Sequence, residues 1–323
     1  MPRLKDIARA LDVSPSTVSN VLAGKGRTSA DLARRVREEA HRLGYAPGGA
    51  GRALKTGRSG VMGLVVPDLA HPLFPRMTQA IERAATDAGY GVLVADSHGD
   101  VTAQREAILR LAGRGADGVI LIPRRGAPAP DGSDRVVILD ASTTPGNAIC
   151  ADHRGGGAGI ARHLRAQGHR NVVLVGETAA SPVQSERIAG MRQELEPGGA
   201  LRVVWHDDEG DAAVIEAVRD GATAVACTSD LLALTLMGSL GEAGLTVPRD
   251  VSVTGFDDLF FAGAMRPGLT TMAADQAEIA RLAVATLVAL IEGTEPPAPR
   301  TVPMTLIPRA TTALPTRQET TTC

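Results

Sequence analysis

Short runs of apolar residues alternate with amphipathic stretches along most of the 323-residue chain, and this alternation restricts the possible folds strongly. The first series of runs is VMGLVVP, GVLVADS, GVILIP and VVILD, with helical patterns at about 74–89 and 101–114. The second series is NVVLVGE, RVVWHD, TAVACTS and VSVTGFD. Such runs are typical of buried strands, and their alternation with helices predicts parallel sheets with right-handed crossovers. Two series predict two doubly wound lobes, with a ligand cleft at the carboxyl ends of the strands.

Basic residues gather at the start of the chain. Residues 1–58 hold 12 Lys and Arg against 5 Asp and Glu, a net charge of +7, whereas the remainder carries −9. This asymmetry suggests that the first segment meets a polyanion, with a solvated charged surface as the alternative. The sequence has no run of about 18 uncharged apolar residues, and its N-terminus lacks the apolar core of a signal peptide. Three widely spaced cysteines match neither a disulfide framework nor a zinc site, so we expect a cytoplasmic protein.

Residues 4–44 carry the pattern of three short helices. The first helix has apolar residues at helical spacing: Leu4, Ile7, Ala8 and Leu11. Ser14 precedes Pro15 and is predicted to cap the second helix, while Thr28 or Ser29 caps a third helix that ends at Gly44. Two short helices joined by a tight turn predict a DNA-reading helix-turn-helix. A plain helical bundle would explain the apolar positions equally well, but it would not explain the basic excess.

The stretches LKDIARALDVSPSTVSNVL and LGYAP resemble the N-terminal domain of the LacI/GalR family of bacterial transcription regulators. The resemblance implies base contacts in the major groove from Pro15, Ser16 and Asn20. It implies phosphate contacts from Thr17 and Ser19, and we count Arg27 among the DNA-binding residues. An asparagine can pair with adenine N6 and N7, whereas a proline offers only an apolar contact, for instance to a thymine methyl.

Residues 47–58, PGGAGRALKTGR, join this head to the rest of the chain. By the same resemblance they form a hinge helix on operator DNA, where Leu54 wedges into a minor-groove step beside the basic Lys55. Arg52 and Arg58 would contact phosphates. Each glycine in a helix costs about 1 kcal/mol relative to alanine, so we expect this hinge to fold only with dimer and operator. A flexible glycine linker is the alternative.

The remainder resembles the family's regulatory domain and periplasmic sugar-binding proteins, through GLVVPDLAHPLF, HLRAQGHRNVVLVGE, SERIAG, VPRDVSVTGFDD and LTTM. The implied fold class is an all-α helix-turn-helix domain, a hinge, and an α/β two-lobed periplasmic-binding-protein-like domain with two parallel sheets. The resemblance also implies three crossings between the lobes, near residues 150, 273 and 303. The expected domains are 1–46, the hinge 47–58, the effector-binding and dimerisation domain 59–312, and a disordered tail 313–323. The lobes are expected at about 59–149 plus 274–302, and 150–273 plus 303–312.

The resemblance places the polar groups of an effector against Arg187 in SERIAG and Asp257 in GFDD. A guanidinium fork and a carboxylate suit the paired hydroxyls of a sugar or other polyol, or an acidic metabolite. Trp205, the only tryptophan, could stack on a sugar ring. Leu73 and Phe74 are expected to line the first lobe's side of the cleft. Further candidates at strand ends are Ser229, Asp68, Ser181, Val183 and Asp207. We expect Asp258 to support the site or cap a helix rather than touch the ligand.

Two of these residues have a purely structural alternative. Arg187 could form a salt bridge across the lobes, and Trp205 could be a partly buried strand residue. The glycine run at 155–159 follows a strand and opens a helix, as a dinucleotide loop does, but it lacks GxGxxG spacing and a following acidic residue. The four histidines of this region show no metal-ligand spacing: His153, His163, His169 and His206. We therefore expect no enzyme activity, no cofactor and no metal.

The function that the residues and the resemblance predict is a repressor controlled by a small polar metabolite, with a sugar as the favoured effector. Its expected partners are pseudo-palindromic double-stranded operator DNA in the nucleoid and a second copy of the chain. The tail ALPTRQETTTC lacks a leucine heptad, so a homodimer is favoured over a tetramer. A repressor activated by a corepressor is the main alternative. A solute-binding protein and a Rossmann-type enzyme are the less favoured readings.

Overall fold

The computed structural model describes residues 4–22, 28–44, 57–123, 135–139, 148–196 and 198–315. The chain divides into two compact units, Met1–Gly60 and Val61–Cys323, and each is described by itself. Within the described ranges, no helix combines the length and the apolar character that crossing a membrane requires.

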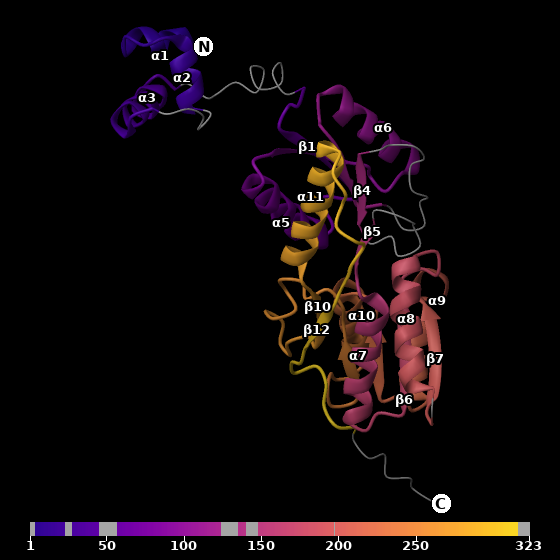
Figure 1. The fold of residues 1–323 in the computed structure, drawn as a ribbon. Helices are drawn as coiled ribbons and strands as arrows, with labels where there is room; N and C mark the ends of the chain where they lie inside the picture. The colour runs from indigo at the N-terminus through magenta and orange to yellow at the C-terminus, as the bar shows by residue number, and fades with distance from the viewer. Residues whose placement is uncertain are drawn as a thin grey trace, which may run out of the picture. The chain divides into compact units, whose positions relative to one another are not determined.

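The first unit is the predicted bundle of three short helices (Figure 1). They are α1 (Leu4–Ala10), α2 (Pro15–Leu22) and α3 (Ala30–Arg42). Ile7, Val18 and Val36 are completely buried between them, because the apolar positions of all three helices face one another. Ser14 Oγ accepts a hydrogen bond from the Thr17 amide at 3.0 Å, which confirms the predicted cap of α2. Of the two residues predicted to cap α3, Thr28 and Ser29, it is Ser29 that does so.

The first lobe of the second unit contains a six-stranded sheet in the order β11-β5-β4-β3-β1-β2, and all its pairings are parallel. Its strands are β1 (Val61–Val66), β2 (Gly91–Asp96), β3 (Val119–Leu121), β4 (Val136–Leu139), β5 (Ala148–Ala151) and β11 (Thr301–Val302). Its helices are α5 (Leu73–Asp87), α6 (Val101–Gly113) and α11 (Gln276–Glu292). Helices α5 and α11 pack together over one face, and α6 covers the other.

The second lobe contains a four-stranded parallel sheet in the order β7-β6-β8-β9. Its strands are β6 (Asn171–Gly176), β7 (Ala200–Trp205), β8 (Ala224–Cys227) and β9 (Ser252–Thr254). Its helices are α7 (His153–Ala166), α8 (Pro182–Leu195), α9 (His206–Arg219) and α10 (Asp230–Glu242). In β6, Leu174 faces the α7–α8 layer and Val175 faces the α9–α10 layer, so alternate side chains serve two cores. The two predicted parallel sheets are therefore confirmed.

The chain passes between the lobes close to the predicted positions. Strand β5 belongs wholly to the first sheet, so the first crossing follows Ala151 instead of residue 150. The other two crossings use β10 (Thr271–Ala274) and β12 (Met304–Ile307), which pair with each other in antiparallel fashion.

The C-terminal boundary differs from the expected one at residue 312. The Ala313 amide donates to Ser252 Oγ at 3.0 Å, and the Ala313 carbonyl lies 2.9 Å from His169 Nε2. These hydrogen bonds fix the backbone to the second lobe, so the expected tail begins too early. The structure describes the chain through Pro315, and residues 316–323 lie outside the described residues.

Candidate functional site

The exposed face of α2 carries the side chains that the sequence predicts to read DNA. Pro15, Ser16, Ser19 and Asn20 are exposed, whereas Thr17 is half-buried. The Ser14 hydroxyl lies 2.7 Å from Ser16 Oγ and 2.8 Å from Thr17 Oγ1, so the start of the helix is held by a small hydroxyl cluster. Short exposed side chains would let the backbone approach a DNA groove closely. Base and phosphate contacts by these residues stay predictions.

Four of the predicted DNA-contacting residues fall outside the described residues, namely Arg27, Arg52, Leu54 and Lys55. The hinge as a whole is described only from Gly57 onward, where Arg58 is half-buried. The expected folding of the hinge on operator DNA therefore stays a prediction.

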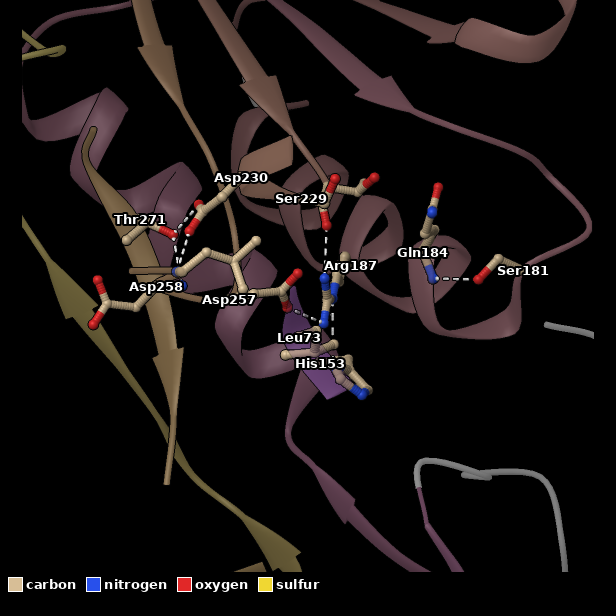
Figure 2. A network of polar contacts seen from close by, with 12 residues as sticks. Leu73, His153, Ser181, Gln184, Arg187, Ser229, Asp230, Asp257, Asp258 and Thr271 are labelled. Atoms are coloured by element: carbon tan, nitrogen blue, oxygen red, sulfur yellow. Dashed lines mark hydrogen bonds and ion pairs between the residues drawn. The ribbon is translucent and has the colours of Figure 1, made fainter. Parts of the chain in front are cut away.

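Arg187 on α8 is the centre of a buried polar network in the second lobe (Figure 2). Its Nη2 lies 2.9 Å from Asp257 Oδ1, and both side chains are at least nine-tenths buried. Its Nη1 donates to the Thr228 carbonyl at 2.6 Å, and its Nε donates to His153 Nδ1 at 3.3 Å. The guanidinium carbon lies 3.9 Å from the centre of the Phe256 ring. The two hydrogen bonds use two of the five guanidinium N–H groups, and the ion pair engages Nη2, so N–H donors remain for a further partner.

The pairing of Arg187 with Asp257 bears on the structural alternative for Arg187, which was a salt bridge across the lobes. Both residues belong to the second lobe, because α8 and the segment after β9 pack on the same sheet. The ion pair therefore lies within one lobe and does not join the two.

Asp257 and Asp258 form a turn in which both residues have positive φ, at 105° and 49°. A non-glycine residue with positive φ is strained and persists only where its surroundings hold it. The Asp257 amide donates to the Met272 carbonyl at 2.8 Å, and Asp258 Oδ1 lies 2.6 Å from Arg309 Nη2. Asp258 thus supports the turn, as expected, but it does so through Arg309 and not as a helix cap.

Asp230, the first residue of α10, lies behind this turn and is completely buried. Its Oδ2 accepts from the Leu259 amide at 2.7 Å, and its Oδ1 accepts from Thr271 Oγ1 at 2.5 Å. Burial, assisted by the neighbouring carboxylate of Asp257, raises the pKa of Asp230 to about 7, against the lowering effect of the Thr271 hydrogen bond. Asp230 did not emerge as a site residue from the sequence, although it follows Cys227, the last residue of β8, by three positions.

Two serines predicted to face a ligand are helix caps. Ser229 Oγ accepts from the Leu232 amide at 3.2 Å at the start of α10. Ser181 Oγ accepts from the Gln184 amide at 3.4 Å at the start of α8. Both serines are buried, and these hydroxyl groups can still donate one hydrogen bond each.

The predicted residues of the first lobe's side lie at the start of α5. Leu73 and Phe74 are half-buried, and Phe74 packs against the core of that lobe. The Phe74 ring centre lies 5.3 Å from that of His71. Asp68 is exposed and accepts a hydrogen bond from the Ala70 amide at 2.8 Å.

Trp205 ends β7 and is half-buried against the α7–α8 layer. Its ring covers Gly176, where an added Cβ would lie only 2.2 Å from a ring carbon. This placement matches the alternative of a partly buried strand residue, and stacking on a sugar stays a prediction. Of the remaining candidates, Asp207 is exposed and Val183 is half-buried.

The glycine run at 155–159 allows two helices to cross closely. A Cβ at Gly157 would lie 2.1 Å from the Arg187 carbonyl oxygen, and one at Gly190 would lie 2.0 Å from the Arg154 carbonyl oxygen. The first turn of α7 is capped by the Asp152 carboxylate, which accepts from the Gly155 amide at 2.8 Å. A carboxylate at this helix end would repel a phosphate. Within the ranges that the structure describes, no three His, Cys, Asp or Glu side chains are grouped to hold a metal.

Comparisons with known proteins cover both units. The chain matches the model of bacterial regulatory proteins of the lacI family over residues 3–48, and a periplasmic binding protein-like domain over residues 161–312. It is 32% identical over 321 residues to the HTH-type transcriptional regulator reg1 of Streptomyces lividans, covering 91% of this chain and 92% of that protein. It is 29% identical over 307 residues to the ribose operon repressor of Haemophilus influenzae, covering 90% and 92%.

Among solved structures, the lac repressor dimer bound to operator and the anti-inducer ONPF superposes with a TM-score of 0.79. The two sequences are 26% identical, and the match covers 97% of this chain and 99% of the other. The likeness therefore extends over the head and both lobes.

Proposed function

Because the chain belongs to the lacI family of bacterial regulatory proteins, we propose that it is a repressor whose affinity for operator DNA is set by a small polar metabolite between its lobes. As a member of this family it is a DNA-binding transcriptional regulator and not an enzyme. The observation that carries the proposal is the buried Arg187–Asp257 pair, which presents unused N–H donors beside a carboxylate. We propose the cytoplasm, at the nucleoid, as its place of action.

The proposed effector is a sugar or a related polyol. A hydroxyl donates to a carboxylate and accepts from a guanidinium, so two adjacent hydroxyls could satisfy Asp257 and Arg187 together. An anion would have to compete with Asp257 for the guanidinium, which favours an uncharged ligand over an acidic one. The printed name of the Haemophilus relative, a ribose operon repressor, supports the same class.

The proposed DNA partner is a pseudo-palindromic operator read by two copies of the chain. The exposed face of α2 supplies Ser16, Ser19 and Asn20, and the segment 1–58 carries a net charge of +7. A dimer with a two-fold axis places two such helices one helical turn of DNA apart. The lac repressor dimer, solved on its operator, supports this arrangement.

Exposed apolar residues of the second unit support a homodimer. Strand β2 is an edge strand of the first sheet, and two of its apolar residues, Leu93 and Val94, are 37% and 42% exposed. An edge strand with exposed apolar side chains invites pairing with another chain unless something covers it. Leu109 on α6 and Leu231 and Leu234 on α10 are also exposed large hydrophobic residues. We propose that a second copy of the chain covers them.

The direction of the metabolite's effect follows from linkage. A ligand that binds one lobe arrangement more tightly must alter DNA affinity by the same factor that DNA alters ligand affinity. We propose release from the operator as the default response. Activation by a corepressor is the alternative, and it gains support if the unliganded protein binds DNA only weakly.

The first test is affinity selection of genomic DNA by the purified chain without added metabolite. We expect recovery of one palindromic site, with affinity that falls steeply as salt rises. Asn20→Ala should lose the preference at one base pair, whereas Asp208→Asn, an exposed position outside the first unit, should bind as the unmodified chain does. Sequence-blind binding in the presence and absence of cell metabolites would refute the DNA half of the proposal.

The effector half is tested by thermal melting with neutral mono- and disaccharides and with their phosphorylated forms. We expect a neutral sugar to raise the melting temperature and to shift the operator affinity of the unmodified chain. Asp257→Asn should weaken that stabilisation, because an amide no longer accepts at both positions. Stabilisation by phosphorylated sugars alone would contradict the proposed class of effector.

A further inference from the structure

Arg76 on α5 forms a hydrogen bond between the two lobes. Its Nη1 donates to the Asp258 carbonyl at 2.5 Å, although the two residues are 182 positions apart. Arg76 belongs to the first lobe, whereas Asp258 lies in the segment between β9 and β10 of the second lobe. Arg76 is exposed, and the structure gives it no ion pair among the described residues.

The carbonyl that accepts this hydrogen bond is held in a fixed position. Behind it, the Leu259 amide donates to Asp230, and the Asp258 amide donates to Thr271 Oγ1 at 3.4 Å. Beside it, the Asp258 carboxylate is paired with Arg309. The strained turn therefore moves with the second lobe as a rigid body.

The same turn faces the proposed effector site. Asp257, which pairs with Arg187, and Asp258, which receives Arg76, are consecutive residues. A change in the lobe arrangement on ligand binding would therefore move the Asp258 carbonyl relative to α5. Because Arg309 already occupies the Asp258 carboxylate, Arg76 is left with an uncharged acceptor. Such a contact is weak enough to form and break as the lobes change their arrangement.

We propose that Arg76 is a positioning residue that couples the effector site to the first lobe by holding the lobes together through the Asp258 carbonyl. The inference rests on the proposed function, because it assumes that the lobe arrangement controls operator binding. Asp230 contributes by fixing the turn that carries this carbonyl. The coupling therefore needs no direct contact between Arg76 and the metabolite.

The test compares operator affinity of the full-length chain and its variants without any metabolite, using the DNA site recovered by selection. Arg76→Ala should change the dissociation constant for operator DNA about two- to tenfold, which is the range of one hydrogen bond. Weaker binding would show that the lobe arrangement held by Arg76 is the one that binds DNA, and tighter binding would show the reverse. Arg76→Lys keeps the charge and a donor and should restore part of the change. Melting temperatures should stay the same, because Arg76 is exposed.

Arg83→Ala is the matched control, because Arg83 is an exposed arginine of the same helix with the same charge. We expect it to bind operator as the unmodified chain does. Equal affinities for Arg76→Ala and the unmodified chain would overturn the inference. An equal change in Arg83→Ala would also overturn it, because the effect would then be one of charge alone. If the unmodified chain selects no DNA site, the proposed function fails and the inference falls with it.

Discussion

Asp230 is expected to make folding stability depend on pH near neutrality. The side chain is completely buried, and burial raises its pKa from 3.8 to about 7. At a pH between these two pKa values, the Asp230 carboxyl keeps its proton in the folded chain but has released it in the unfolded chain. The free energy of unfolding therefore falls as the pH rises. For a pKa of about 7, this one group lowers stability by roughly 3 kcal/mol between pH 5 and pH 8.

The perturbation is Asp230→Asn, because the amide is neutral, close in shape and able to serve both partners of the carboxylate. Its oxygen can accept from the Leu259 amide, and its NH₂ group can donate to Thr271 Oγ1. From pH 5 to pH 8 we expect the variant to gain roughly 3 kcal/mol of unfolding free energy relative to the unmodified chain.

The assay is urea unfolding at the two pH values, followed by the fluorescence of Trp205. This tryptophan is the only one in the chain and lies in the same lobe as Asp230. Comparing variant with unmodified protein cancels the other titrating groups, and Asp208→Asn, an exposed position of the same lobe, serves as control. The reasoning is refuted if the difference in unfolding free energy between the variant and the unmodified chain is the same at both pH values. It is also refuted if the variant is less stable by several kcal/mol at both, because the carboxyl is then held as a charge.

Four further variants test other features of the chain. Gly190→Ala should lower the free energy of unfolding by about 1–3 kcal/mol, since its Cβ would strike a backbone carbonyl of α7. Gly241→Ala, with open space around it on α10, should be neutral or stabilising in the same denaturant titration. Asn20→Ala should reduce discrimination at one operator base pair by about 1–3 kcal/mol, measured by competition between DNA variants. Burial lowers the pKa of His169, so the folded chain resists its protonation. The contribution of His169 to stability is therefore lost as the pH falls below the pKa of histidine in the unfolded chain. The difference in melting temperature between the unmodified chain and His169→Gln should be smaller at pH 5 than at pH 7.

The parts of the fold that depend on local pattern were predictable from the sequence. Apolar runs and helical periodicity located the strands and helices of both lobes, and the Ser14-Pro15 pair located the start of α2. The crossings between the lobes came from the resemblance and agree within a few residues. The boundary at 312 was wrong, because the hydrogen bonds of Ala313 reach residues far away in the sequence.

The site was harder to predict, since its contacts join distant segments. Arg187 and Asp257 were named from the resemblance, but their pairing within one lobe required the packing of α8 against the segment after β9. The contacts of Asp230 and Arg76 could not be predicted locally, because Asp230 binds a residue 29 positions away and Arg76 binds one 182 positions away. For Ser229 and Ser181 a signal existed: each stands directly before a helix, as Ser14 does, and the capping rule applied to Ser14 identifies them as caps.

The order of segments along the chain also determines when each part can be completed during synthesis. The head closes its core within its first 44 residues, because the buried residues of α1, α2 and α3 form one cluster. The first lobe buries Ile279 and Leu287 of α11 beside α5 and adds β11 at its edge, so one apolar face of its sheet stays only partly covered until α11 and β11 have been made. A nascent chain therefore carries a finished head while this lobe is still an open sheet exposed to aggregation. The proposed response to a metabolite would become available only when translation is nearly over.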